Sequence, residues 1–476
     1  MSNSSEKVKS ESNTTTCNEI ITKEFLQNVL KIEAKKKGDP VSEIISHSVT
    51  LGTKPGENYA SIIYAVDIHL SGGTRRHLLI KCYPNNPSRQ QFTNNFNFFF
   101  KECDVYSKWI PELRRIQTEV LGLGNDELVN LPYAKFLHGE CIDFQSDEGK
   151  IRLTGKINSI DNYIVMEDLR KTHGFRMNYR REPFDLDHMK LAVTAFARVH
   201  ALSWAYRHHV ERNITDKFPC LVTHVSDEGV AIWNDVTLTS LEQAKGVYNR
   251  AFGPGNDYSA AVDKFCPLVG KMTNFFTGHE TAEGFDKLMR ITKPDPAKFG
   301  KDAENPEPWR IICHGDCNNN NMLFRYDATT GKPLEIALVD LQLSHETCVI
   351  HDLQYLFFVS TTSEFRRNHI DDLLLLYHDT FNNVCAKLRT PTLPGFCMDS
   401  LQFRFHRAKF FGYYIAMMVL PVSLSVGEIA DMENMEEGKD ITEAFVEQFC
   451  DFTRPNELLK GRLCEITREM IADGVF

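Results

Sequence analysis

The segment Ile311–Phe324 places a polar turn between two apolar runs, and it constrains the fold more than any other part of the chain. Both runs are short and bounded by turn-forming residues, which is typical of buried β-strands. His314, Asp316 and Asn321 stand in or at the end of the turn. The sequence therefore predicts a strand–turn–strand unit that holds three polar side chains close together.

The spacing of these three residues suits a particular chemistry. His-x-Asp-x-x-x-x-Asn is the spacing of the catalytic loop of phosphotransferases. Asp316 can accept a proton from an attacking hydroxyl, and Asn321 can offer its amide oxygen to Mg²⁺. Turns rich in Asp and Asn are also common in ordinary loops, so this pattern alone leaves a structural role as an equal alternative.

A second acidic residue favours the functional interpretation. Asp340 follows the predicted strand Leu334–Val339. A carboxylate at a strand end can hold the metal ion that bridges nucleotide phosphates. Because a hairpin would bring this strand end next to the loop, we expect Asn321 and Asp340 to form a Mg²⁺ site beside Asp316.

Lys81 is a candidate phosphate-binding residue in the first third of the chain. It follows the apolar run Leu78–Ile80 in a predicted hairpin, and Glu102 on the next predicted helix is the natural carboxylate to hold its ammonium. A solvated lysine at a strand end is the ordinary alternative, but Lys81 precedes the catalytic-loop pattern as a phosphate-binding lysine should. The turn Gly52–Ser61 could contact phosphates through backbone N–H groups and Ser61.

Other polar residues fit structural roles. His200 stands inside a long predicted helix, where we expect a core histidine with satisfied hydrogen bonds, and Asp352 is expected to hold the catalytic loop by hydrogen bonds. Cys313 and Cys317 are four residues apart, but no second pair completes a zinc site. The sequence contains no G-x-S-x-G or H-E-x-x-H motif.

Composition excludes several classes of protein. The chain has 476 residues, and its 42% hydrophobic and 25% charged residues are ordinary for a globular protein. Its net charge of −10, without a long basic block, disfavours nucleic-acid binding. Thirteen scattered cysteines and an N-terminus without an apolar signal segment favour a cytoplasmic location. No feature predicts a protein partner.

The segment Phe410–Gly427 has the length of a short membrane span and contains no charged residue. Pro421 interrupts it, however, and charged residues bracket it closely, among them Lys409 and Glu428. We therefore expect a buried core helix followed by a bend at the proline, and no membrane span.

Three parts can be distinguished along the chain. Residues 1–18 are polar and are expected to form a disordered tail. Residues 19–168 contain most predicted strands and are expected to form a nucleotide-covering N-lobe. Residues 169–476 are mostly helical and contain the catalytic loop, so we expect the acceptor site there. The predicted fold class is α+β, with a small antiparallel-sheet lobe and a large, mostly helical lobe.

The order of these parts resembles the ecdysteroid-kinase-like family of insects, within the larger choline- and aminoglycoside-kinase-like group. The similar stretches follow the family's order across most of residues 50–360. They are Gly56–Ser61, Leu79–Lys81, Glu102–Tyr106, Val165–Leu169, Phe196–Ser203, His314–Phe324 and Leu338–Phe357.

The resemblance implies a two-lobed, protein-kinase-like fold that transfers the γ-phosphoryl group of ATP to a hydroxyl of a small molecule, with Mg²⁺. By this analogy the nucleotide is held by Lys81, Glu102 and Ser61 and by backbone at Met166, Glu167 and Asp168. Asp316 is then the catalytic base, His314 orients its loop, and Asn321 and Asp340 hold the metal.

Three hypotheses for function follow. The first is a kinase acting on an ecdysteroid or a related lipophilic alcohol. The second is a kinase for an amino alcohol such as choline or ethanolamine, which would need an acidic or aromatic cage that the sequence does not reveal. The third is a non-catalytic kinase fold that binds a lipophilic ligand, which does not explain why Lys81, Asp316, Asn321 and Asp340 are all present.

The chain departs from the family's pattern at two places. Cys317 and Asn318 follow Asp316 where the family often has bulky apolar residues, and the second motif is Asp340-Leu-Gln342 where Asp-Phe-Gln is more usual. Neither change removes a charge that the mechanism needs. The first could alter the acceptor pocket.

Overall fold

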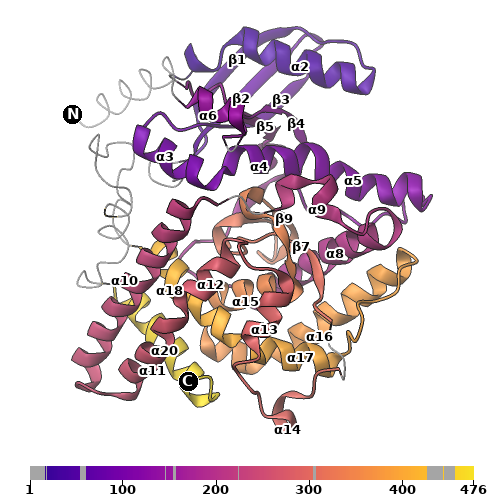
Figure 1. Ribbon diagram of the computed structural model, residues 1–476. Coiled ribbons are helices and arrows are strands. Elements are labelled where there is room, and N and C mark those ends of the chain that lie inside the picture. Colours follow the sequence, from indigo (N-terminus) through magenta and orange to yellow (C-terminus); the bar gives the residue numbers. More distant parts are fainter. Residues whose placement is uncertain are drawn as a thin grey trace. The chain divides into compact units, whose positions relative to one another are not determined.

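A computed structural model describes residues 17, 19–53, 61–144, 146–153, 157–222, 225–303, 307–425, 443 and 456–476 (Figure 1). The chain forms two compact units, each described below by itself. The first contains the described residues of Met1–Ser107 and Ala134–Phe175, and the second those of Lys108–Tyr133, Arg176–Gly427 and Asp440–Phe476. The disordered tail predicted for residues 1–18 lies outside the described residues, Cys17 excepted.

The first unit is built on a five-stranded antiparallel sheet with the order β1-β2-β3-β5-β4. Its strands are β1 (Ile44–Leu51), β2 (Ile62–Leu70), β3 (Arg75–Cys82), β4 (Phe136–Glu140) and β5 (Tyr163–Glu167). The predicted hairpin of β2 and β3 is confirmed. Its turn needs glycine because Gly72 and Gly73 have φ angles of 88° and 83°.

Alternating side chains give the two faces of this sheet different partners. Leu78, Ile80 and Cys82 belong to a core that includes residues of α2 (Lys23–Lys37). Tyr83 on the other face joins a second core with residues of α4 (Phe98–Asp104). Because successive residues of a strand point to opposite faces, Lys81 lies on the side of α4.

Helices complete the first unit. They are α2, α3 (Pro87–Phe96), α4, α6 (Asp147–Arg152) and α7 (Leu169–His173). The helix predicted to carry Glu102 is present as α4. It is interrupted on both sides, because Asn97 before it is left-handed with a φ of 51° and the π-helical turn η1 (Val105–Trp109) separates it from α5 (Ile110–Arg115).

The second unit is mostly helical. Its longer helices are α8 (Leu186–His209), α10 (Asp227–Phe252), α15 (Val349–Ser360), α16 (Ser363–Lys387), α18 (Lys409–Ser423) and α20 (Glu457–Ala472). Its shorter helices are α9 (Ile214–Lys217), α11 (Asp257–Phe265), α12 (Val269–Phe276), α13 (Ala282–Met289), α14 (Pro296–Phe299) and α17 (Met398–Arg407). α8 packs along α16, and α15 packs against α18.

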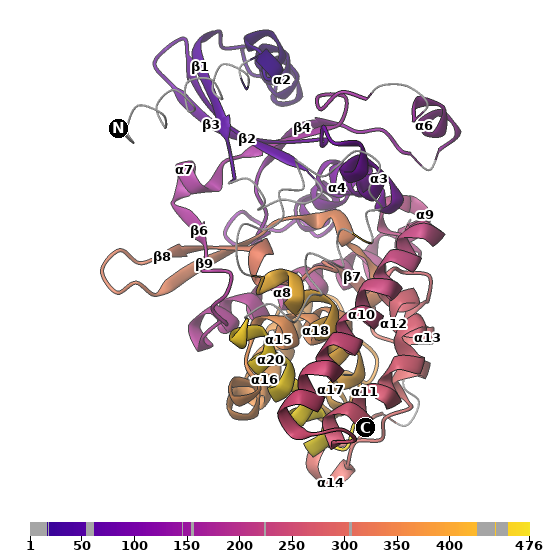
Figure 2. The same cartoon turned by 90° about the vertical axis from the view of Figure 1, so that its left-hand side faces the viewer.

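Short strands in this unit carry the loop of interest. β7 (Arg310–Cys313) pairs with β10 (His345–Cys348), and β8 (Met322–Tyr326) lies between β6 (Phe175–Met177) and β9 (Pro333–Leu338). Figure 2 shows β8 and β9 as a projecting hairpin. The predicted α+β class, with an antiparallel sheet in the N-terminal part and a helical C-terminal part, is confirmed.

The uncharged segment near the C-terminus forms α18, a buried core helix as predicted. A Cβ atom at Gly412 would lie 2.4 Å from the Phe358 ring, so only glycine allows α15 to approach this closely. Pro421 lies inside the last turn of this helix, which ends at Ser423, so the helix extends past the proline at which the bend was expected. None of the described helices combines the length and the apolar composition that a membrane span requires.

The boundary between the two units differs from the one expected at residue 168 in two stretches of the chain. Residues 108–133 group with the helical unit. The contacts explain this, because Glu112 accepts a hydrogen bond from Tyr206 at 3.0 Å and the Pro132 carbonyl accepts one from the Leu338 N–H at 2.6 Å. Residues 169–175, with α7, group with the sheet unit.

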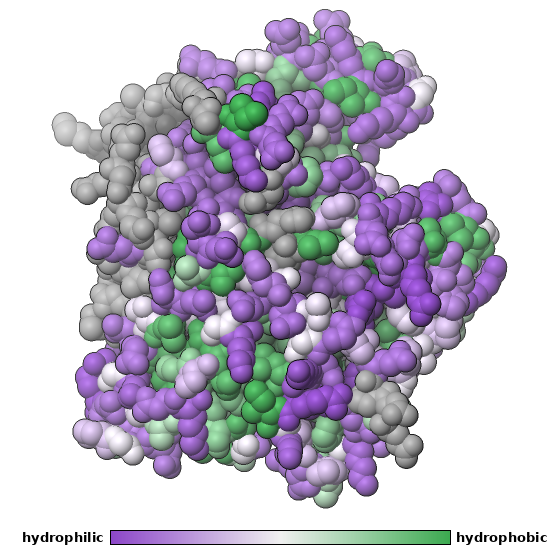
Figure 3. All heavy atoms as spheres, viewed as in Figure 1, coloured by the Kyte–Doolittle hydropathy of each residue, from purple (hydrophilic) through white to green (hydrophobic). Residues whose placement is uncertain are grey.

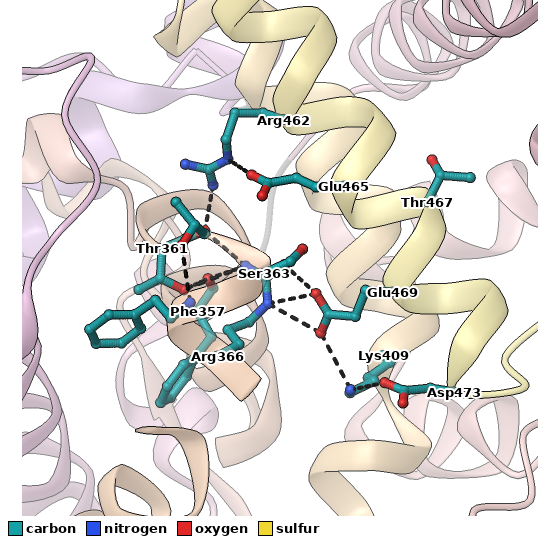
Figure 4. A network of polar contacts seen from close by, with 12 residues as sticks. Phe357, Thr361, Ser363, Arg366, Lys409, Arg462, Glu465, Thr467, Glu469 and Asp473 are labelled. Atoms are coloured by element: carbon teal, nitrogen blue, oxygen red, sulfur yellow. Dashed lines mark hydrogen bonds and ion pairs between the residues drawn. The ribbon is translucent and has the colours of Figure 1, made fainter. Parts of the chain in front are cut away.

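A buried charge network fixes the C-terminal helix to the second unit (Figure 4). Arg366 binds Glu469 of α20 with an Nη2–Oε2 distance of 2.5 Å and donates to the Thr361 carbonyl at 2.8 Å. Lys409 lies 3.4 Å from Glu469 and also pairs with Asp473. Hydrophilic residues cover much of the face seen in Figure 3. The charged side chains of this network lie inside the unit, where each needs an opposite charge.

Replacing Glu469 tests this network. Burial would raise the pKa of Glu469, but the charge of Arg366 outweighs burial and lowers the pKa to about 2. A carboxylate whose pKa is lowered by folding stabilises the fold at pH values above its ordinary pKa of 4.5. This stabilisation is lost as the pH falls towards 2. Glu469→Gln should therefore lower the free energy of unfolding at pH 7 by roughly 3 kcal/mol, with a smaller difference below pH 4.

Urea unfolding at several pH values measures the effect. Glu457→Gln on the same helix is the matched control, because its side chain is 84% exposed and pairs only with Lys460 among the ion pairs of the described residues. This control should cost less than about 1 kcal/mol. An equal effect of the two substitutions would contradict a buried network that anchors α20.

Candidate active site

Lys81 and Glu102 form a buried ion pair in the first unit. The distance from Lys81 Nζ to Glu102 Oε2 is 2.6 Å, and their side chains are 8% and 2% exposed. The pairing that the sequence predicted is therefore present. Phe99, one turn before Glu102 on α4, lies with its ring centre 6.0 Å from the ammonium.

The residues predicted to face adenine lie at the end of β5. The Glu167 N–H donates to the Lys135 carbonyl, and the Asp168 N–H donates to the His77 carbonyl, both at 3.0 Å. The Asp168 side chain is buried, accepts a hydrogen bond from the Arg170 N–H and begins α7 as its N-cap. Asp168 thus has a structural role, and the contact of this backbone with adenine stays a prediction.

Ser61 is the first described residue after the turn that was expected to contact phosphates. It is buried, and its carbonyl accepts a hydrogen bond from Arg89 Nη2 at 2.9 Å. Residues 54–60 of that turn lie outside the described residues. The predicted phosphate contact stays a prediction.

The catalytic-loop pattern of the second unit connects β7 to β8. Gly315 has a φ of 83°, and a Cβ atom there would lie 2.1 Å from the Leu343 carbonyl oxygen. Only glycine fits this position, because both the backbone conformation and the space exclude a side chain. The loop ends in the 3₁₀ turn η5 (Asn319–Asn321), directly before β8.

Asp352 holds this loop by hydrogen bonds, as predicted. It is buried near the N-terminus of α15, where the helix dipole favours a negative charge. Its carboxylate accepts hydrogen bonds from the N–H groups of His314 at 2.7 Å and Gly315 at 3.0 Å, and from His200 and His351. Burial would raise the pKa of Asp352, but the hydrogen bonds from the two histidines outweigh it and hold the pKa well below the usual range.

His314 connects the loop to the second acidic motif. Its Nδ1 accepts a hydrogen bond from the Asp316 N–H at 3.3 Å, so Nε2 carries the proton and donates to the Val339 carbonyl at 3.1 Å. Val339 directly precedes Asp340. One imidazole therefore fixes both the backbone of Asp316 and the residue before Asp340, which agrees with the orienting role expected for His314.

Asp316, two residues after His314 in the loop, is half-buried. Asn321 donates from Nδ2 to Asp316 Oδ2 at 2.7 Å and to the Asp316 carbonyl at 3.1 Å. Burial, and after it the negative charge of Asp340, raises the pKa of Asp316. The Val339 N–H donates to the Asn321 carbonyl at 3.0 Å, so the backbone directly before Asp340 lies beside the end of the loop, as the hairpin argument predicted.

Asp340 has an unusual backbone conformation, with φ and ψ of 64° and 67°. A non-glycine residue in the left-handed region costs energy and is often found at functional sites. The Asn321 amide nitrogen faces Asp316, which leaves its amide oxygen for a cation. A carboxylate and an amide oxygen are hard donors of the kind that Mg²⁺ prefers, so these residues fit the ion.

His200, Cys313 and Asp352 also lie close enough to be considered for a metal ion. Both nitrogens of His200 are already engaged, Nδ1 with the Tyr377 hydroxyl at 2.7 Å and Nε2 with Asp352 at 3.1 Å. The cluster is a hydrogen-bonding network under the loop, and the prediction of a satisfied core histidine is confirmed.

The sequence pattern of the ecdysteroid kinase-like family matches residues 55–390, which is more than half of the chain. The chain belongs to the ecdysteroid kinase-like family. This membership confirms the resemblance seen in the motifs and identifies the chain as a small-molecule kinase, an enzyme class that uses a nucleotide.

The fold was also compared with solved structures, and one of those that match is an aminoglycoside phosphotransferase. The GDP complex of wild-type aminoglycoside 2'-phosphotransferase-IIIa is 12% identical, and the similarity covers 93% of this chain and 97% of that chain with a TM-score of 0.37. No curated protein matches the sequence.

The structure separates the predicted residues into two groups. Lys81, Glu102, Ser61 and the end of β5 belong to the first unit, whereas His314, Asp316, Asn321 and Asp340 lie together in the second. That all of them serve one nucleotide stays a prediction. Sequence reasoning missed Asn318 and Tyr355, which both donate to Asp316; the only signal was the departure from the family pattern at Asn318.

Replacing Glu102 tests the buried pair of the first unit. Glu102→Gln keeps the shape of the side chain but removes the charge that faces Lys81. Because loss of one partner leaves a buried charge poorly compensated, the free energy of unfolding should fall by roughly 3 kcal/mol or more. The exposed pair of Lys245 and Asp263, 2.5 Å apart, provides a control, since Asp263→Asn should cost less than about 1 kcal/mol. A Glu102→Gln protein as stable as the wild type in urea would contradict this account.

Proposed function

We propose that this protein transfers the γ-phosphoryl group of ATP, with Mg²⁺, to a hydroxyl group of a small lipophilic alcohol, an ecdysteroid or a related compound. The observation that carries the proposal is the Asp316 carboxylate. Its loop is held by hydrogen bonds to Asp352, its Oδ2 accepts a hydrogen bond from Asn321, and His314 of the same loop donates to the carbonyl of Val339, the residue before the second acid, Asp340.

Asp316 is the proposed general base. The acceptor's O–H bond breaks and its proton moves to the Asp316 carboxylate, while the acceptor oxygen forms a bond to the γ-phosphorus. The bond between that phosphorus and the β–γ bridging oxygen breaks, and ADP leaves with the electron pair. The raised pKa of Asp316 makes its carboxylate a better proton acceptor than an ordinary aspartate.

Asn321 and Asp340 are the proposed holders of Mg²⁺, through the amide oxygen and the carboxylate. When bound, the ion would neutralise phosphate charge. It would also offset the repulsion that Asp340 exerts on the charged form of Asp316.

Lys81 is the proposed partner of the α- and β-phosphates. Its ammonium is held by Glu102 at 2.6 Å, and this fixes a cation on an inner strand of the sheet. A compact ammonium suits a phosphate oxygen. We propose that Ser61 and the backbone of Met166–Asp168 complete nucleotide binding in this unit.

Family membership supports the choice of an ecdysteroid-like alcohol as acceptor. The test has two alternative outcomes. One is transfer to amino alcohols such as choline and ethanolamine, and the other is no transfer to any compound. We also propose a cytoplasmic location, because the described cysteines are all free thiols, as expected in a reducing compartment.

A phosphoryl-transfer assay tests the proposal. The purified protein is incubated with Mg²⁺ and γ-labelled ATP and a panel of ecdysteroids, sterols and amino alcohols, and the labelled phosphate esters are separated. We expect label in an ecdysteroid or related alcohol. Transfer to amino alcohols alone would contradict the proposed acceptor, and no transfer to any compound would contradict the proposed activity.

Asp316→Asn tests the base. The amide keeps the size of the side chain but cannot accept the proton, so kcat should fall by roughly 10²- to 10⁴-fold. ATP affinity, measured by calorimetry, should change less than about threefold, since the base does not bind the phosphates. Full activity of Asp316→Asn would exclude Asp316 as the base.

Asp340→Asn tests the metal site. Loss of this carboxylate should weaken binding of Mg-ATP roughly tenfold or more, while binding of ATP in the presence of EDTA should stay nearly the same. Asp327→Asn, on the exposed turn after β8 and bonded only within that turn among the described residues, is the control. Unchanged Mg-ATP affinity in Asp340→Asn would contradict the assignment.

A further inference from the structure

The carboxylate of Asp316 is surrounded by three side-chain donors. Its Oδ1 accepts hydrogen bonds from the Tyr355 hydroxyl and from Asn318 Nδ2, both at 2.6 Å. Its Oδ2 accepts one from Asn321 Nδ2 at 2.7 Å. Since each carboxylate oxygen has two lone pairs, Oδ1 is fully used and Oδ2 keeps one lone pair for a further donor.

Tyr355 is placed by the helix that also anchors the loop. It follows Asp352 by three residues on α15, so the two side chains lie on neighbouring positions of one helix face. Asp352 holds the loop backbone at His314 and Gly315, while Tyr355 holds the carboxylate of Asp316. Tyr355 is 2% exposed, so its hydroxyl does not exchange this partner for bulk water.

Asn318 has an amide orientation fixed by its own loop. Its Oδ1 accepts a hydrogen bond from the Asn320 N–H at 2.9 Å, so its Nδ2 must point towards Asp316. Asn318, which stands where the family often has an apolar residue, thus contacts the proposed base directly. It does not present an apolar surface to an acceptor.

We propose that Tyr355 and Asn318 are positioning residues that hold Oδ1 of Asp316, so that Oδ2 is the atom that takes the acceptor's proton. This inference rests on the proposed function. The two donors keep the carboxylate in one rotamer, and the remaining lone pair of Oδ2 sets the direction from which the alcohol must approach. Loss of either donor lets the carboxylate rotate and lowers the fraction of complexes in which Oδ2 meets the hydroxyl.

The test separates kcat from KM. Tyr355→Phe removes only the hydroxyl, so kcat for the phosphorylated acceptor should fall about ten- to a hundredfold, the effect of losing a hydrogen bond to a charged group. KM for ATP should change less than about twofold, because neither donor is proposed to touch the nucleotide. Tyr414→Phe is the matched control: Tyr414 is also buried, and its hydroxyl donates to Thr273 Oγ1 at 3.1 Å. It should keep the wild-type kcat.

Asn318→Asp distinguishes positioning from loop structure. Aspartate keeps an acceptor for the Asn320 N–H but loses the donor towards Asp316, so kcat should fall at least as far as in Tyr355→Phe. A wild-type kcat in this variant would overturn the role of Asn318, because it would show that only the loop turn matters.

A double substitution shows whether Tyr355 acts through Asp316. In the Asp316→Asn background, Tyr355→Phe should cause no further loss of kcat, since the carboxylate that it positions is gone. Additive losses, or a wild-type kcat in Tyr355→Phe alone, would overturn the proposal. These outcomes are distinct from failure of the proposed function, in which the wild-type protein itself phosphorylates none of the acceptors.

Discussion

The second unit depends on one buried charge. The Asp352 carboxylate is removed from water, which costs several kcal/mol for an uncompensated ion, and donors on three sides compensate it: the loop N–H groups of His314 and Gly315, His200 from α8, and His351 from its own helix. The loop conformation satisfies the carboxylate, and the carboxylate in turn fixes the loop. This reciprocal requirement explains how a short turn rich in Asn can hold one defined conformation.

The same rule governs the first unit. Lys81 points to the α4 side of the sheet because its strand neighbours fill the α2 side, and it is stable there because Glu102 lies 2.6 Å away. A charge kept inside in this way is already desolvated and oriented, as the proposed binding of a phosphate requires. In both units, therefore, the residues proposed for catalysis are held by buried ionic or hydrogen-bonded partners, and their positions do not depend on flexible surface contacts.

Sequence patterns predicted the elements that follow from local periodicity and the residues that follow from motif spacing. The β2–β3 hairpin, the pairing of Lys81 with Glu102, and the role of Asp352 are examples. What the sequence could not supply depends on how an element is rotated within the packed unit. Tyr355 is 39 residues from Asp316, and nothing in its neighbourhood distinguishes it from other buried tyrosines until α15 is placed.

Local chemistry explains two features that motif spacing did not predict. Asp168 belongs to the backbone predicted to contact adenine, and its side chain caps α7, because an aspartate directly before a helix satisfies that helix's free N–H groups. Pro421 was expected to bend the chain after the core helix. It lies near the helix end, where little of the helix remains to be disrupted.

The stereochemistry of transfer tests the central claim most directly, namely that Asp316 takes a proton and not the phosphoryl group. The measurement uses ATP with a γ-phosphorus made chiral by oxygen isotopes and sulfur, and it determines the configuration of the phosphorylated acceptor. A single in-line displacement assisted by a base predicts inversion at phosphorus. Retention would mean that the phosphoryl group passes through a covalent enzyme intermediate, and it would contradict the role assigned to Asp316.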